Sequence, residues 1–140
     1  MRLDIGYPDR AAERALLESG GRREHLPALG ACLAPEQIGR LQKQAAAVHV
    51  SGPLLDYVQA LVQATRHSTR FIHGLSPRAA LSLVAAARAW AFIQDRPMVL
   101  PEDVQAVLPS VACHRLQKAD GDGHARQEDI LELIKTIPVG

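Results

Sequence analysis

Residues 76–93 have the sequence SPRAALSLVAAARAWAFI, and this stretch decides the fold. Ser76 is a preferred residue just before a helix, and Pro77 is tolerated at the first helical position because its missing N–H would have no partner there. The alanines and leucines that follow are strong helix formers. Apart from Ser82 and Arg88 the segment is apolar on nearly every side, which predicts a central helix packed by neighbours on several faces.

The composition is typical of a helical globular domain. At 140 residues the chain has the length of one ordinary domain. Ala and Leu together supply 40 residues, against 20 for Val, Ile and Thr, and this ratio favours helix over sheet. Apolar residues make up 47% and charged residues 22%, a globular balance. The net charge of +1 excludes the strongly basic surface of a general nucleic-acid binder.

The sequence carries no signal for a membrane or for secretion. The longest apolar stretch, residues 79–93, is interrupted by two polar residues and falls short of the roughly 18 uninterrupted residues that a membrane span needs. Residues 1–9 lack the apolar region of a signal peptide. The two cysteines lie far apart, which favours free thiols in a reducing compartment. We therefore expect a soluble, cytoplasmic protein.

Helical patterns also flank the central segment on both sides. Start signals and apolar periodicity predict helices over residues 9–19, 35–47, 53–66, 101–111 and 126–136, with loops over residues 20–33 and 118–125. The residues expected to face inward are Ile38, Leu41 and Ala45 in the second helix, Leu54, Val58, Leu61, Val62 and Thr65 in the third, and Val104, Val107, Leu108 and Val111 in the fifth. The fold class is therefore an all-α bundle of five or six helices. An optional two-stranded β patch would pair residues 48–50 with residues 99–100.

The sequence carries no motif of the common self-contained catalytic or metal sites. The chain has no Gly-Lys pair, so it lacks a phosphate-binding P-loop and cannot hydrolyse ATP alone by that route. It has no Gly-x-Ser-x-Gly nucleophile motif, and its histidines and cysteines lack the spacing of a zinc site. Residues 120–123, Asp-Gly-Asp-Gly, are similar to the start of a calcium loop, but Leu131 stands where the closing Glu belongs. We expect no metal site.

Arg78 places a positive charge where the start of a helix disfavours one. It is the second residue of the predicted central helix, where the helix dipole disfavours a cation by about 0.3–1 kcal/mol. A cation beside the free amides of a helix start makes a site for an anion, and guanidinium geometry suits phosphate oxygens. Its attraction to one anion at about 4 Å, roughly 4 kcal/mol before desolvation, outweighs the dipole penalty. The alternative is that Arg78 is an ordinary solvated arginine, and Arg66 and Arg70 are interpreted as lining a solvated helix end.

Four segments occur in an order that matches a known family. They are Ile5-Gly6-Tyr7-Pro8-Asp9, then His49-Val50-Ser51 with Leu54-Leu55-Asp56-Tyr57, then Gly74-Leu75-Ser76-Pro77-Arg78-Ala79-Ala80-Leu81, and then Val99-Leu100-Pro101-Glu102-Asp103-Val104. Taken together they resemble the C-terminal lid domain of MoxR-type AAA+ ATPases. The resemblance covers essentially the whole chain, although residues 20–33 diverge and Ala34 stands where the family usually has Ser or Thr.

The resemblance implies a role for each matching site residue. Arg78 occupies the position of the sensor 2 arginine, which reaches the γ-phosphate of ATP, and Ser76 and Pro77 would aim it. Gly6, Tyr7 and Pro8 would form a hinge close to the adenine. Residues 1–8 would then be the hinge and the tail of the ATPase core, and residues 9–140 the helical lid.

The resemblance also implies partners that lie outside this chain. ATP and Mg²⁺ would be held in the full-length protein, whose core carries the Walker motifs, and the chain alone would be inactive. A ring oligomer, a hexamer in the usual form of the family, and a partner with a von Willebrand factor A domain would be expected, in a chaperone-like machine. The alternative from a different class is a stand-alone helical module that binds a protein partner and has no nucleotide role.

Overall fold

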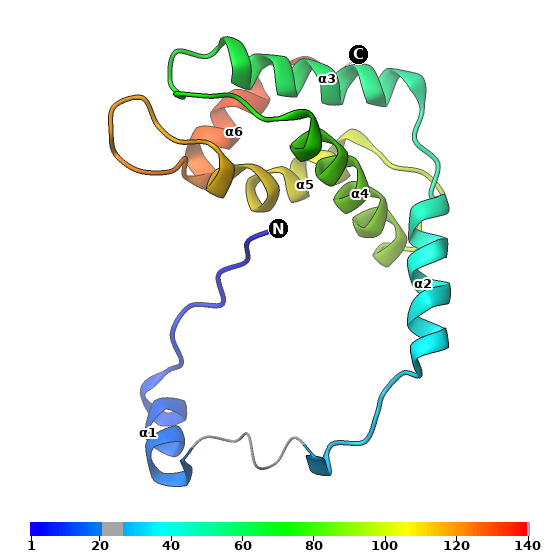
Figure 1. Ribbon diagram of the computed structural model, residues 1–140, viewed down its shortest axis with the longest axis vertical. Coiled ribbons are helices and arrows are strands. Elements are labelled where there is room, and N and C mark those ends of the chain that lie inside the picture. The colour runs from blue at the N-terminus through cyan, green and yellow to red at the C-terminus, as the bar shows by residue number, and fades with distance from the viewer. Residues whose placement is uncertain (21–26, 140) are drawn as a thin grey trace.

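The computed structural model describes residues 1–20 and 27–139, and these residues form an all-α fold (Figure 1). The α-helices of this part of the chain are α1 (Arg10–Ser19), α2 (Pro35–Ala47), α3 (Gly52–His67), α4 (Pro77–Ile93), α5 (Pro101–Ala112) and α6 (Gln127–Lys135), with a 3₁₀ turn, η2 (Cys113–Arg115), after α5. The six helices confirm the predicted fold class, and their bounds lie within a few residues of the predicted ones.

Side-chain caps and prolines start the helices, as their residue types predict. The side-chain oxygens of Asp9, Ser51 and Ser76 accept hydrogen bonds from backbone amides three residues later, at 2.8, 3.3 and 3.2 Å. These bonds satisfy amides that have no partner inside the helix. Ala34 cannot do so, but the side chain of Gln37 accepts from the Ala34 amide at 2.7 Å instead.

Helices α3, α4, α5 and α6 form a compact bundle. The predicted inward residues of α3 and α5 are all buried. The side chains removed most completely from water come from several elements and include Leu61, Leu83, Val104, Leu108, Leu116 and Ile130. The C-terminal part of α2 joins this bundle beside α4 (Figure 1). Hydrophobic burial in this region is therefore the main source of stability.

The predicted β patch is present only as a single bridge. The amide of His49 donates to the carbonyl of Pro97 at 3.1 Å, and the amide of Val99 donates to the carbonyl of His49 at 2.9 Å. These two bonds make one parallel bridge between His49 and Met98. It ties the segment between α2 and α3 to the segment between α4 and α5.

Helix α4 packs against three other helices, α5, α2 and α3, as expected for a central helix, but one of its faces stays exposed. Its buried residues are Ala79, Leu83, Ala87 and Ala91. By contrast, Leu81 is 73% exposed and Ile93 is 71% exposed. The small alanines let α5 lie close on the buried face, and α2 and α3 also pack against α4.

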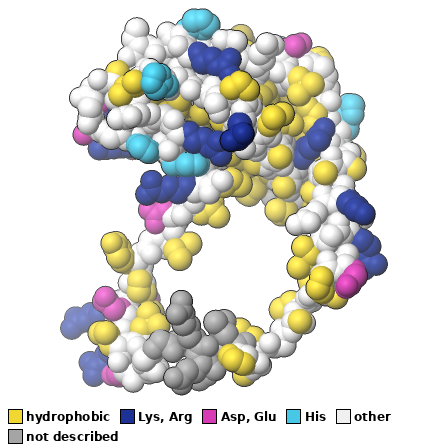
Figure 2. Space-filling view, viewed as in Figure 1, with side chains coloured by type: hydrophobic (Ala, Val, Ile, Leu, Met, Phe, Trp, Pro, Cys, Tyr) yellow, Lys and Arg dark blue, Asp and Glu magenta, His cyan; other side chains and the backbone are white. Residues whose placement is uncertain are grey.

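Helix α1 and the first half of α2 form an open arm. Helix α1 lies apart from the bundle, and none of its residues is buried (Figure 1). Ile38 and Leu41, which were expected on an inner face of α2, are 45% and 38% exposed. That expectation is wrong for this chain because no described element lies over these side chains. Hydrophobic side chains consequently remain visible along the arm (Figure 2).

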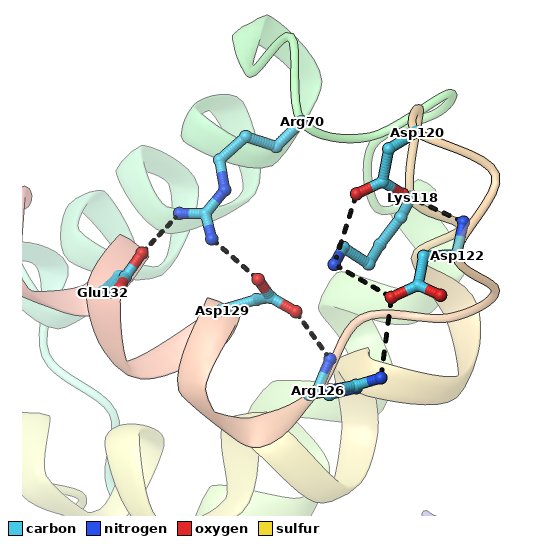
Figure 3. A network of polar contacts seen from close by, with 7 residues as sticks. All are labelled: Arg70, Lys118, Asp120, Asp122, Arg126, Asp129 and Glu132. Atoms are coloured by element: carbon cyan, nitrogen blue, oxygen red, sulfur yellow. Dashed lines mark hydrogen bonds and ion pairs between the residues drawn. The ribbon is translucent and has the colours of Figure 1, made fainter.

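The two predicted loops have different outcomes. Residues 21–26 of the first loop lie outside the described residues, and residues 27–33 form only short turns. In the second, Gln117 and His124 form an antiparallel bridge and close a tight loop. The ammonium of Lys118 lies 3.4 Å from Asp120 and 3.9 Å from Asp122 (Figure 3), so one lysine contacts both carboxylates of the Asp-Gly-Asp-Gly run.

Two features are absent from the described residues. None of their helices combines the length and the apolar character needed to cross a membrane. Nowhere in these residues do three or more His, Cys, Asp or Glu side chains lie together as a metal site would require.

Candidate functional site

The start of α4 brings Ser76, Pro77 and Arg78 together. Ser76 has extended backbone angles, φ −71° and ψ 161°, and its hydroxyl accepts from the Ala79 amide at 3.2 Å. Pro77 occupies the first helical position and Arg78 the second. Because Ala79 is buried at 1% exposure, the start of the helix is anchored in the core while Arg78 projects from it.

The guanidinium of Arg78 is exposed and is not paired with another side chain of the described residues. No hydrogen bond or ion pair joins it to another side chain in the described part of the chain. The first turn of α4 contains no acidic residue, whereas the first turn of α6 contains Glu128 and Asp129. The positive charge of Arg78 therefore adds to the positive end of the helix dipole, with no carboxylate to offset either.

The residue before the cap is fixed to α3 through both of its backbone polar groups. The amide of Leu75 donates to Thr65 Oγ1 at 3.0 Å, and Arg66 Nε donates to the Leu75 carbonyl at 3.0 Å. The hydroxyl of Thr65 in turn donates to the Val62 carbonyl at 2.6 Å. The start of α4 is thus tied to the last turns of α3. Sequence reasoning missed this contact because it placed Thr65 only in an apolar stripe.

Gly74 allows this close approach. A Cβ added at Gly74 would lie 2.5 Å from Arg66 Cα, 2.5 Å from Arg66 Cγ and 2.6 Å from Arg66 N. Real Cβ atoms do not approach other atoms so closely, so a larger residue would force the two segments apart. The position of Gly74, directly before the Leu-Ser-Pro-Arg run, was a signal of this contact.

Arg70 is exposed just after α3 and lies in an ion-pair network with α6. Its guanidinium contacts Asp129 at 2.7 Å and Glu132 at 2.9 Å, both on α6 (Figure 3). The pKa of Asp129 is lowered, chiefly because its carboxylate accepts from the Arg126 amide, and also because Arg70 binds it. Arg66 and Arg70 are both exposed, in and just after the last turn of α3, as expected for a solvated helix end, but each also makes a contact that was not predicted.

The expected hinge residues lie on the connection that leads to α1. Gly6 has φ +66°, which favours glycine, and its amide donates to Asp4 Oδ1 at 2.8 Å. Tyr7 is fully exposed, and Pro8 is also exposed. Among the described residues, no hydrogen bond joins these three residues to the start of α4. The structure groups Ser76, Pro77 and Arg78, and leaves Gly6, Tyr7 and Pro8 separate from them.

A shallow apolar groove runs between α3 and α4, beside the start of α4. It has a volume of about 440 Å³ and is lined mainly by Val58, Val62, Ala80, Leu81 and Val84, with Arg66 at its edge. An apolar groove of this kind is suited to another protein surface more than to a small polar ligand.

A cation held at an ordered helix start can bind an anion without rearrangement. The exposed guanidinium offers parallel donors for two oxygens, the geometry that phosphate and carboxylate groups accept. In contrast, the described residues offer no nucleophile paired with a base and no metal site. The chemistry that this site can perform is electrostatic stabilisation of an anion.

Comparison with known proteins identifies the family. The AAA lid domain family matches residues 63–134, about half of the chain. Chaperone MoxR1 of Mycobacterium tuberculosis is 36% identical over 124 residues, which cover 82% of this chain and 32% of MoxR1. Protein MoxR of Paracoccus denitrificans is 39% identical over 108 residues, covering 65% of this chain and 32% of that protein. The chain thus spans about a third of the length of these two relatives.

A crystal structure has the same fold. It is that of a protein from Cytophaga hutchinsonii proposed to be an ATPase, and it matches with a TM-score of 0.80 at 23% identity. The match covers 97% of this chain and 45% of that one, so the shared fold includes the open arm as well as the bundle. The chain therefore belongs to the AAA lid domain family, and within that family to the lids of MoxR-type AAA+ ATPases.

Proposed function

We propose that this lid closes over ATP held by the core of the same polypeptide and that Arg78 contacts the γ-phosphate as the sensor 2 arginine. The observation that carries the proposal is the exposed, uncommitted guanidinium at the second position of α4. An arginine in that position is disfavoured by the helix dipole unless an anion meets it. A triphosphate bound on a facing domain would supply that anion.

The exposed apolar side chains of the arm support the proposal that a core domain packs against this lid. Leu17 of α1 is 82% exposed, and Ile38 of α2 is 45% exposed. Apolar side chains gathered on one arm indicate a surface that is normally covered. The two MoxR relatives are about three times as long as the matched region, so their remaining length could form such a cover. On this proposal residues 1–8 are the hinge and the tail of the ATPase core, and residues 9–140 are the lid.

The role of Arg78 would be to stabilise charge. During phosphoryl transfer, negative charge spreads over the oxygens of the γ-phosphate, and a fixed cation lowers the energy of that state. Ser76 and Pro77 would hold the helix start in place, so that little reorganisation is needed as the charge develops. ATP and Mg²⁺ would be bound by the core, and Gly6, Tyr7 and Pro8 would lie near the adenine.

Replacing Arg78 in the full-length ATPase tests the assignment. We expect Arg78→Ala to lower the kcat of ATP hydrolysis by about a hundredfold or more, because a preorganised charge donor is lost. The matched control is Arg126→Ala, which also removes an exposed arginine at a helix start, but one that already contacts Asp122 at 3.5 Å. Unchanged turnover in Arg78→Ala, with a folded protein, would refute the sensor role.

Binding of ATP to the chain alone gives a second test. Since the core would supply the other phosphate contacts, we expect calorimetry to detect only weak binding. A dissociation constant in the nanomolar range would contradict the proposal that the core supplies most of the contacts to ATP.

A stand-alone interaction module is the second candidate function, and the groove between α3 and α4 favours it. That groove is lined mainly by apolar side chains, including Leu81, which is 73% exposed. If Arg78→Ala leaves ATP turnover intact while Leu81→Glu abolishes binding of a protein partner, this candidate replaces the first.

The assembly of the full protein also belongs to the proposal. As a member of its family the lid would communicate nucleotide state around a ring, proposed to be a hexamer, in a chaperone-like machine. A partner with a von Willebrand factor A domain is part of the same expectation. Mass measurement of the full-length protein with and without ATP would test the ring.

A further inference from the structure

We propose that Thr65, Arg66 and Gly74 form a clamp that positions Arg78, so that the end of α3 sets where the sensor arginine lies. This inference rests on the proposed function, because it assigns these three positioning residues to the same site. None of them is proposed to touch the nucleotide. Their effect would reach the phosphate only through the backbone of α4.

Thr65 is built for this task because it is fully enclosed and uses its hydroxyl twice. Its exposed fraction is 1%, and Oγ1 donates to the Val62 carbonyl while accepting from the Leu75 amide. Neither bond can be replaced by water at a buried position. The hydroxyl therefore fixes the distance between the last turns of α3 and the residue that precedes the cap of α4.

Arg66 completes the hold on the same residue. Its Nε donates to the Leu75 carbonyl at 3.0 Å, so consecutive residues of α3 bind the two polar groups of one peptide segment. Leu75 itself is only 2% exposed, and its side chain is anchored in the core. With both backbone groups and the side chain held, Leu75 has little freedom to shift or rotate.

Gly74 sets how closely the two segments approach. Arg66 Cα and N lie 2.5 and 2.6 Å from where a Cβ at Gly74 would be. These are backbone atoms of a helix, so they cannot turn away as the end of a flexible side chain could. Any residue other than glycine would displace the segment that leads into Ser76.

Only a few residues separate the clamp from Arg78, so a shift at the clamp would move Arg78. Leu75 is followed directly by the cap Ser76, and Arg78 lies two residues further on. A misplacement of about 1 Å in a reacting constellation can cost about a hundredfold in rate. The clamp would therefore influence turnover without contacting ATP.

The first test examines the clamp in the chain itself. We expect Thr65→Val, which keeps the shape and removes the hydroxyl, to speed hydrogen exchange of the Leu75 amide by about tenfold or more. Thr65→Ser should restore protection. Thr136→Val is the matched control, because Thr136 Oγ1 makes the same type of bond to the Leu133 carbonyl at 2.7 Å, at the end of α6. Unchanged exchange of Leu75 in Thr65→Val would overturn the clamp.

The second test measures ATP turnover in the full-length protein. We expect Thr65→Val and Gly74→Ala each to lower kcat by about tenfold to a hundredfold with KM little changed, and Thr65→Ser to restore kcat. Gly52→Ala is the control for Gly74→Ala, since a Cβ at Gly52 meets nothing within 4 Å. Combined with Arg78→Ala, the clamp substitutions should cause no further loss of kcat, because they act through Arg78.

The possible outcomes separate this inference from the proposed function. The clamp substitutions can be compared in the protein that keeps Arg78 and in the Arg78→Ala variant. If they lower kcat by the same factor in both, they act on general stability and the inference is overturned. If Arg78→Ala lowers kcat but the clamp substitutions do not, the inference fails and the sensor assignment stands. If Arg78→Ala itself leaves kcat unchanged, the proposed function fails and the positioning role fails with it.

Discussion

The bundle and the arm use similar apolar residues in different ways. In the bundle, Leu61 of α3 and Leu83 of α4 are 0% exposed, while Leu17 of the arm is 82% exposed. Both regions form regular helices with well-defined starts, so local sequence signals are equally strong in the two. They differ in whether the chain itself supplies something to pack against.

The comparison teaches that an amphipathic pattern predicts a helix but does not say where its partner lies. The apolar spacing of the arm predicts buried side chains, but they are exposed. The chain as a whole shares its fold with a longer protein over 97% of its length. We infer that the bundle folds by its own contacts and that, as proposed above, a core domain covers the arm.

The largest effects are expected from truncating leucines. Leu61→Ala should lower the free energy of unfolding by about 2–5 kcal/mol, since it removes a buried side chain and leaves a cavity. Leu17→Ala should change it by less than about 0.5 kcal/mol in this chain. Chemical denaturation followed by circular dichroism measures both. Equal losses in the two variants would show that the arm is packed as firmly as the bundle.

Removing a charged pair should also lower the free energy of unfolding more in the bundle than in the arm, though by less than truncating a buried leucine. In the bundle, Asp103 is fully buried, contacts Arg96 and accepts from the Leu100 amide at 2.8 Å. Asp103→Ala should therefore cost about 1–3 kcal/mol of unfolding free energy.

The matched pair in the arm joins Arg14 and Glu18 across one turn of α1, at 2.8 Å, with both side chains exposed. Glu18→Ala should cost less than about 0.5 kcal/mol. The division between the regions would be contradicted if Glu18→Ala were as damaging as Asp103→Ala in the same denaturation experiment.

The smallest effect is expected at the contact between Arg70 and Asp129. The pKa of Asp129 is lowered in the folded state, chiefly by the Arg126 amide, so its carboxylate stabilises the fold at pH values above the unfolded pKa of about 3.9. That stabilisation is lost as the pH falls through the folded pKa. Asp129→Asn should therefore be less stable than the unsubstituted chain at pH 7, and the gap should shrink below about pH 4. A gap that stays constant from pH 7 to pH 3 would rule out this contribution.

Much of the fold could be predicted from sequence because its determinants are local. Ser76 with Pro77 and Ser51 before α3 announce helix starts, and the spacing of Leu54, Val58 and Leu61 predicts the buried face of α3. The exposure of Ile38 could not be predicted, because it depends on whether another element packs over this side chain after folding.

The site was predictable in part for the same reason. Arg78 could be found because a cation at the start of a helix conflicts with a local rule. The contact of Thr65 with Leu75 and the pairing of Arg70 with α6 could not be found in this way. They join residues that are separated in the sequence and become neighbours only after folding. Gly74 was the one local sign of that approach.

The most direct test of the account is the distance between the Arg78 guanidinium and the γ-phosphate in a structure of the full-length ATPase with a non-hydrolysable ATP analogue. The account predicts a hydrogen bond of about 2.7–3.0 Å from guanidinium to phosphate oxygen, with the arm packed against the core. A guanidinium that points into solvent or pairs with a carboxylate in that closed state would contradict it.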